Sequence, residues 1–89
     1  MLRLLYISVR GHKCLLGGPT LDAAAAVPPG VGVWFASHRE VERHVQTELR
    51  GLSAYWQVQV VDEAGRVVRR GFRSGANGTG ERWIWHVEP

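Results

Sequence analysis

The sequence has little of several features, and each shortage excludes a class of protein. It contains a single cysteine, Cys14, so no disulfide can form within the chain and packing alone must hold the fold. No apolar run approaches the ~18 residues that a membrane helix requires. Arg3 interrupts the apolar residues 1–10, and no small-residue cleavage site follows them. We therefore expect an N-terminal strand rather than a signal peptide, no membrane partner, and a cytoplasmic location.

The sequence also lacks the motifs that carry chemistry. No Gly-x-Ser-x-Gly, Walker or dinucleotide fingerprint occurs, and the glycine-rich residues 75–80 lack the strand-then-helix setting of a phosphate loop. His38 and His44 lie six positions apart, so one helix face cannot present both to a metal ion. Asp62 and Glu63 are adjacent carboxylates in a predicted turn, where water solvates them. We predict no enzymatic activity, no metal and no cofactor.

Length and composition limit the architecture. With 89 residues, of which 45% are hydrophobic and 21% charged, the chain has an ordinary globular composition and room for one core. Disordered, collagen-like and coiled-coil classes are excluded, and we predict a single domain over 1–89. A core of this size leaves little surplus stability, so dimerisation would be a simple way to gain more.

The first third of the chain predicts two strands and a long connection. Apolar residues on both faces of 2–9 predict a central strand. A tight turn around Gly11, which takes the left-handed conformation, leads into a short returning strand at 14–16. Residues 17–33 are rich in Gly, Pro and Ala and predict a long loop with one short helical turn at 21–26. A connection of this length is typical of a loop that wraps the domain or of one that carries function.

The clearest helix signal lies at 37–50. Ser37 can accept a hydrogen bond from the Glu40 N–H while the Glu40 carboxylate reaches back to Ser37, which forms a capping box. Gly51 follows and ends the helix. The apolar positions form one narrow stripe, made of Val41, Val45, Leu49 and Leu52. Such a stripe predicts a helix that packs through one side only.

Two strands joined by a turn are predicted after the helix. Residues 54–61 alternate with period two, which places Trp56 on the same face as Val58. A tight turn then leads into an antiparallel strand, in which Phe72 points toward the core and Arg69 away from it.

A last strand follows a glycine-rich connection. It has Trp83 and Trp85 on one face and Ile84 and His86 on the other. Antiparallel strands therefore fill 54–87. Together the elements predict an α+β fold, with an antiparallel twisted sheet of four to five strands, one helix packed on one face, and the chain order β-β-α-β-β-β.

Basic charge is concentrated late in the chain. Five arginines against Glu81 give residues 66–82 a net charge of +4, whereas the whole chain carries +3. The planar arginine fork suits phosphates, carboxylates and aromatic faces. Four tryptophans are more than a narrow helix stripe can cover, so some aromatic surface is expected to stay exposed. The candidate binding residues are Arg66, Arg69, Arg70, Phe72, Arg73, Arg82, Trp83 and Trp85.

These residues favour a binding protein over an enzyme. Our first expectation is protein–protein interaction, because Trp and Arg are enriched at interface hot spots. An accessory factor or inhibitor from a phage or mobile element is the role we expect for such a chain. One alternative is nucleic-acid binding through 66–85, with arginines on phosphates and aromatic rings on unpaired bases. Another is a homodimeric structural domain. A protein without a binding partner would show the same excess of arginine and tryptophan if the arginines kept an exposed strand in solution and the tryptophans lay in the core.

Overall fold

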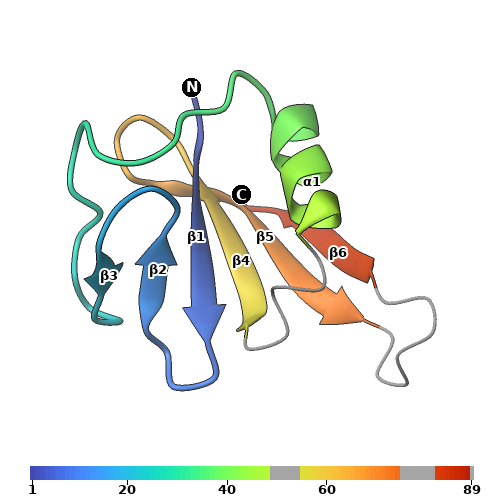
Figure 1. Cartoon of the computed structure of the whole chain (residues 1–89), viewed down its shortest axis with the longest axis horizontal. Helices are drawn as coiled ribbons and strands as arrows, with labels where there is room; N and C mark the ends of the chain where they lie inside the picture. Colours follow the sequence, from blue (N-terminus) through green and yellow to red (C-terminus); the bar gives the residue numbers. More distant parts are fainter. Residues whose placement is uncertain (49–54, 75–81, 89) are drawn as a thin grey trace.

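The computed structural model describes residues 1–48, 55–74 and 82–88. In these ranges the chain forms one antiparallel sheet and one helix (Figure 1). The elements in chain order are β1 (Arg3–Ser8), β2 (Lys13–Leu15), β3 (Thr20–Leu21), α1 (His38–Thr47), β4 (Tyr55–Val61), β5 (Val67–Ser74) and β6 (Arg82–Val87). The sheet has six strands in the order β3-β2-β1-β4-β5-β6. The strand direction rotates from β1 to β6, so the sheet is twisted (Figure 1).

The antiparallel sheet and single helix agree with the predicted α+β composition, but the prediction of four to five strands is wrong. The additional strand is β3, which lies where the sequence predicts a loop and a helical turn at 21–26. β3 pairs with β2, and the next residues form a turn closed by the Ala25 N–H, which donates to the Asp22 carbonyl at 3.0 Å. Pairing with β2 satisfies more backbone groups than one isolated helical turn can, because helix nucleation is unfavourable. The observed chain order is therefore β-β-β-α-β-β-β.

β1 lies inside the sheet between β2 and β4, as its apolar residues on both faces predict. Gly11 has a φ of 87°, the left-handed conformation that the sequence predicts for the turn between β1 and β2. Leu4 and Tyr6 are buried on one side of the sheet, and Leu5 and Ile7 are buried on the other. Both sides of β1 are therefore covered by other parts of the chain.

Helix α1 covers one side of the sheet, which we call the helix side. Val41 and Val45 are 0% and 1% exposed, and they pack in one cluster with residues of β1, β4 and β6. The helix therefore packs on the sheet through one side, as its narrow apolar stripe predicts. α1 ends at Thr47 with Glu48 as its cap, so the predicted end at residue 50 is wrong. The rest of that stripe, Leu49 and Leu52, lies outside the described residues, as does Gly51.

The start of α1 is held by side chains on both sides of its first turn. Ser37 Oγ accepts the Glu40 N–H at 3.3 Å, as predicted. The Glu40 carboxylate reaches one residue further back than predicted and accepts the Ala36 N–H at 2.8 Å. The first contact satisfies a backbone donor that the first helical turn leaves without a partner, and the second satisfies the donor just before the cap.

Replacing Ser37 with alanine is expected to lower the free energy of unfolding by about 1 kcal/mol, because the Glu40 N–H loses its acceptor. Urea denaturation measures this difference. The matched control is Ser37→Asp, which keeps an acceptor at the same position and is expected to unfold like the wild type. Equal stability of the alanine variant would contradict a role for the serine hydroxyl.

A long loop of residues 22–36 covers the other side of β1 and β4. Val27 packs against the cluster that contains Leu5 and Val61 on this side. Phe35, near the end of the loop, belongs to the helix-side cluster and pairs with Leu2 just before β1. The loop therefore passes from one side of the sheet to the other near the N-terminus, and it wraps the domain (Figure 1).

Arg3 holds this loop from inside. The side chain comes from β1 and is only 1% exposed. Its Nη1 donates to the carbonyls of Pro28 at 2.5 Å and Val31 at 2.9 Å. Its guanidinium carbon also lies 4.7 Å from the centre of the Trp34 ring, in cation–π geometry. One buried side chain thus binds the loop at three points.

Candidate binding surface

The prediction that Trp56 shares a face with Val58 is wrong. The pairing of β1 with β4 shifts register between Ile7 and Ser8, which leaves Trp56 as the extra residue of a β-bulge. The indole packs on the ring of Phe72 and donates from Nε1 to the Ser8 carbonyl at 3.0 Å. The bulge therefore brings Trp56 to the side of the sheet that faces away from α1.

The predicted orientations of Phe72 and Arg69 are also wrong. The pairing of β4 with β5 shifts register beside Val60, which leaves Val68 as the extra residue. Arg69 then pairs with Val60 on the helix side, and Phe72 lies on the opposite side. An extra residue in a strand exchanges the faces of the residues that follow it, because successive side chains alternate.

A row of ring side chains crosses β4, β5 and β6 on the side away from α1. The Trp56 and Phe72 ring centres are 5.8 Å apart, and those of Phe72 and His86 are 5.5 Å apart. Ile84 lies beside this row, because it pairs with Phe72 across the two strands. Trp56 and Ile84 are 45% and 42% exposed, and His86 is exposed as well. We call these four residues the open face.

Amide and guanidinium groups lie next to the open face. Gln59 Nε2 donates to Gln57 Oε1 at 2.8 Å, and Arg70 Nη1 contacts the same oxygen at 3.4 Å. Arg70 also forms an ion pair with Glu88. Gln57 itself is buried, so these contacts fix its amide, while Gln59 and Arg70 are half-buried at the margin of the rings.

Some of the predicted binding residues lie on or near this side of the sheet. Arg70 and Phe72 do so, whereas Arg66 is exposed in the turn that precedes β5, six positions before Phe72 in the chain. Arg73 and Arg82 belong to β5 and β6, but their side chains lie outside the described part of the chain. The structure therefore places only part of the predicted set together.

The other predicted binding residues lie on the helix side. Trp83 is 7% exposed and belongs to the core cluster. The Trp85 ring meets the His38 ring of α1 edge-on, with 4.8 Å between the two ring centres. Burial and the Arg69 charge lower the pKa of His38, and they outweigh Glu42, whose carboxylate lies 3.3 Å away and raises it. Because this pKa lies below the ordinary histidine value, His38 is neutral at neutral pH. Trp83 and Trp85 pack between the sheet and the helix.

The sequence does not predict a surface that contains Trp56, Ile84 and His86 together. The alternation of the last strand places Ile84 and His86 opposite Trp83, and the structure confirms this. That alternation was a usable signal, because the side opposite a core tryptophan is the side that can face solvent. Trp56 carried no such signal, since its orientation depends on a bulge that period-two alternation does not contain.

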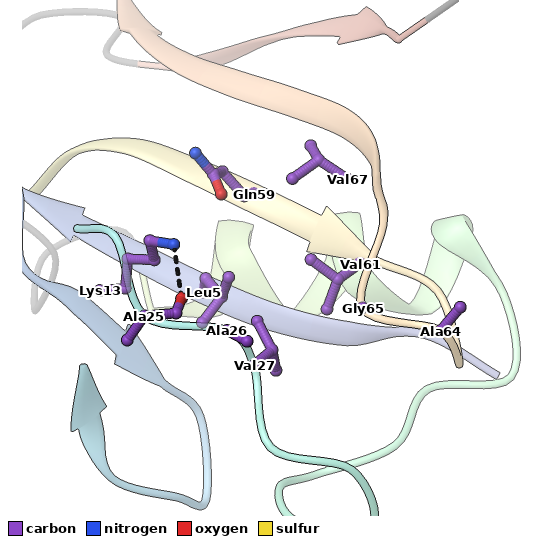
Figure 2. Close-up of a pocket in the computed structure, with 10 residues that line it drawn as sticks. All are labelled: Leu5, Lys13, Ala25, Ala26, Val27, Gln59, Val61, Ala64, Gly65 and Val67. Atoms are coloured by element: carbon purple, nitrogen blue, oxygen red, sulfur yellow. Dashed lines mark hydrogen bonds between the residues drawn. The ribbon is translucent and has the colours of Figure 1, made fainter. Parts of the chain in front are cut away.

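A second feature of this side is a cavity of about 210 Å³ between the loop and the sheet. Figure 2 shows Val27 of the loop facing Val61 and Val67 of the strands, with α1 behind the sheet. The lining is mostly aliphatic, and Lys13 Nζ already donates to the Ala25 carbonyl at 3.0 Å (Figure 2). The cavity is smaller than ligand pockets of roughly 300–1,000 Å³. We interpret it as a packing gap beneath the loop.

Two further findings concern residues 1–48, 55–74 and 82–88. Within these ranges, no three His, Cys, Asp or Glu side chains are grouped so that they could hold a metal ion. In the same described part, no helix has the length and apolarity needed to cross a membrane. No protein-family model, curated protein or solved structure matches the chain.

Proposed function

We propose that this protein is a non-enzymatic binding protein and that its open face takes single-stranded nucleic acid. The observation that supports this proposal is the row formed by Trp56, Phe72 and His86 across three neighbouring strands. Rings at the surface of a sheet provide planes on which unpaired bases stack. Because every base has a π face, such a surface binds without strong sequence preference.

The row is held in place before any ligand arrives. Trp56 Nε1 donates to the Ser8 carbonyl at 3.0 Å, which restrains the indole although much of it is exposed. Phe72 is half-buried and contacts a ring on each side. Side chains that are already ordered lose less entropy on binding, so their contacts contribute more to affinity.

Polar and basic groups near the rings suit the rest of a nucleotide. The Gln59 amide offers hydrogen-bonding groups beside the stacking surface, where the edges of bases would lie. The pI of about 9.8 favours association with a phosphate backbone. Arg66 is exposed in the turn before β5 and adds to the positive charge of the chain, whereas Arg70 is already engaged with Glu88.

A protein partner, the first expectation from the sequence, is the second candidate. The exposed apolar surface of Trp56 and Ile84 supports it, because such residues anchor protein interfaces. Trp83, one of the expected anchors, lies in the helix-side core and leaves this candidate with fewer contacts. A row of rings on a basic chain favours nucleic acid.

Replacing Trp56 with alanine removes one stacking surface. We expect this change to weaken the binding of a labelled single-stranded oligonucleotide of about ten bases by about tenfold or more. Fluorescence anisotropy at about 50 mM and about 200 mM salt measures the affinity and its salt dependence. Arg66→Ala is expected to make the salt dependence shallower, since it removes one exposed positive charge from the chain.

The matched control is Val33→Ala, which removes a 43%-exposed side chain from the loop and is expected to bind like the wild type. Equal affinity for single and double strands would mean that charge alone drives binding, and it would contradict stacking on the open face. Absence of binding at the lower salt concentration would overturn the nucleic-acid proposal and favour the protein partner.

A further inference from the structure

The turn that joins β1 to β2 is bonded directly to the open face. The Ser8 carbonyl accepts the Gly11 N–H at 2.9 Å, which closes the turn, and it also accepts Trp56 Nε1 at 3.0 Å. The Ser8 N–H donates to the His12 carbonyl at 3.0 Å, and Ser8 Oγ accepts the His12 N–H at 3.2 Å. These four hydrogen bonds hold the turn beside the Trp56 indole.

The two central residues of this turn, Val9 and Arg10, face solvent. Val9 is 81% exposed, and Arg10 is exposed as well. Both lie between Ser8 and Gly11, so a single tight turn separates them from the carbonyl that binds Trp56. An apolar and a basic side chain therefore continue the exposed surface beyond the indole.

The charge of Arg10 has no acidic partner in the described part of the chain. Residues 1–21 contain neither Asp nor Glu, and Asp22 is the first acidic residue of the sequence. Among residues 1–48, 55–74 and 82–88, no ion pair includes Arg10 or Asp22. The Arg10 guanidinium is therefore available to an anion from solution.

The acidic turn after β4 lies at the other end of the sheet (Figure 1). Ser8 at the end of β1 pairs with Tyr55 at the start of β4, so the turn with Arg10 lies where β4 begins. Asp62 and Glu63 follow the end of β4. A phosphate beside Trp56 would therefore meet the basic turn and would avoid repulsion by these two carboxylates.

We propose that Arg10 binds the phosphate backbone of the strand on the open face, next to the nucleotide that stacks on Trp56. This inference rests on the function proposed above and adds a free cation to a ring row whose neighbouring Arg70 is paired with Glu88. The planar fork of a guanidinium matches the oxygens of a phosphate. The bound strand then runs from His86 on β6, across the rings, to the turn between β1 and β2.

Anisotropy of a labelled oligothymidine of about ten bases tests this proposal with Arg10→Ala. We expect the affinity at about 50 mM salt to fall by about threefold to tenfold. The slope of log affinity against log salt is expected to become shallower by about 0.7, the contribution of one phosphate contact on a single strand. Arg10→Lys keeps the positive charge and is expected to lose less affinity than alanine.

Arg39→Ala is the matched control, because it removes an exposed arginine from α1 on the other side of the sheet. We expect it to bind within about twofold of the wild type, and both alanine variants to keep the wild-type circular dichroism spectrum. An Arg10→Ala loss no larger than that of Arg39→Ala would overturn the Arg10 contact, and a loss in Trp56→Ala would still support the open face. A wild type that does not bind would overturn both proposals.

Discussion

Arg3→Ala is expected to lower the free energy of unfolding by about 3 to 5 kcal/mol, the largest effect we expect from a single substitution in this chain. The side chain makes two charge-assisted hydrogen bonds, to Pro28 and Val31, and stacks on Trp34. Alanine would leave both carbonyls without this donor and a void where the guanidinium lies. Urea denaturation measures the loss.

Arg3→Met separates the two contributions. Methionine keeps most of the apolar stem and removes the buried charge together with its hydrogen bonds. We expect it to be about half as destabilising as alanine, because it avoids the void and the cost of burying a charge. Amide hydrogen exchange is expected to accelerate in residues 22–36 for both variants. Exchange that stays slow in this loop would show that Arg3 does not hold it.

Gly71→Val is expected to destabilise the fold by about 3 kcal/mol through overpacking. Gly71 lies in β5 between Val58 of β4 and Trp85 of β6. A Cβ atom at this position would come within 2.7 Å of Val58 Cγ2 and 3.0 Å of Trp85 Cζ3. The glycine therefore provides the space that lets the Trp85 ring cover the strand beside it, as aromatic side chains do for glycines in sheets.

A double-mutant cycle tests this explanation. Gly71→Ala introduces the clash with the fewest added atoms, and Val58→Ala removes the methyl group that it meets. The two substitutions together are expected to cost less than the sum of their separate effects. Additive losses would mean that the glycine is needed for a reason other than the space beside Val58. Denaturation curves of the four proteins provide the measurement.

The features that the sequence predicts well depend on local chemistry. Ser37 caps α1 because its hydroxyl can reach the Glu40 N–H, three residues further along the chain, without help from the rest of the fold. Gly11 takes a positive φ where it closes the turn after β1, its N–H donating to the Ser8 carbonyl at 2.9 Å. The inner position of β1 followed from apolar residues on both of its faces. Each of these signals is contained within a few neighbouring residues.

The features that the sequence does not predict depend on pairing between distant strands. β3 consists of two residues, too few for a period, and exists because β2 offers an edge. The bulges at Trp56 and Val68 arise from the fit of β4 against β1 and β5. They moved Trp56 and Phe72 to the open face and Arg69 to the helix side. The predicted binding residues therefore lie on a mixture of sides, and none of them belongs to β4, which carries Trp56.

The position of β1 between β2 and β4 also constrains the order of folding. β2 follows β1 directly, but β4 lies in the second half of the chain, beyond the wrapping loop and α1. Contacts between distant segments form late, because the loop between them must first be closed. During synthesis, Leu4 and Tyr6 would therefore await Val58 and Val60 of β4 until most of the chain has emerged from the ribosome.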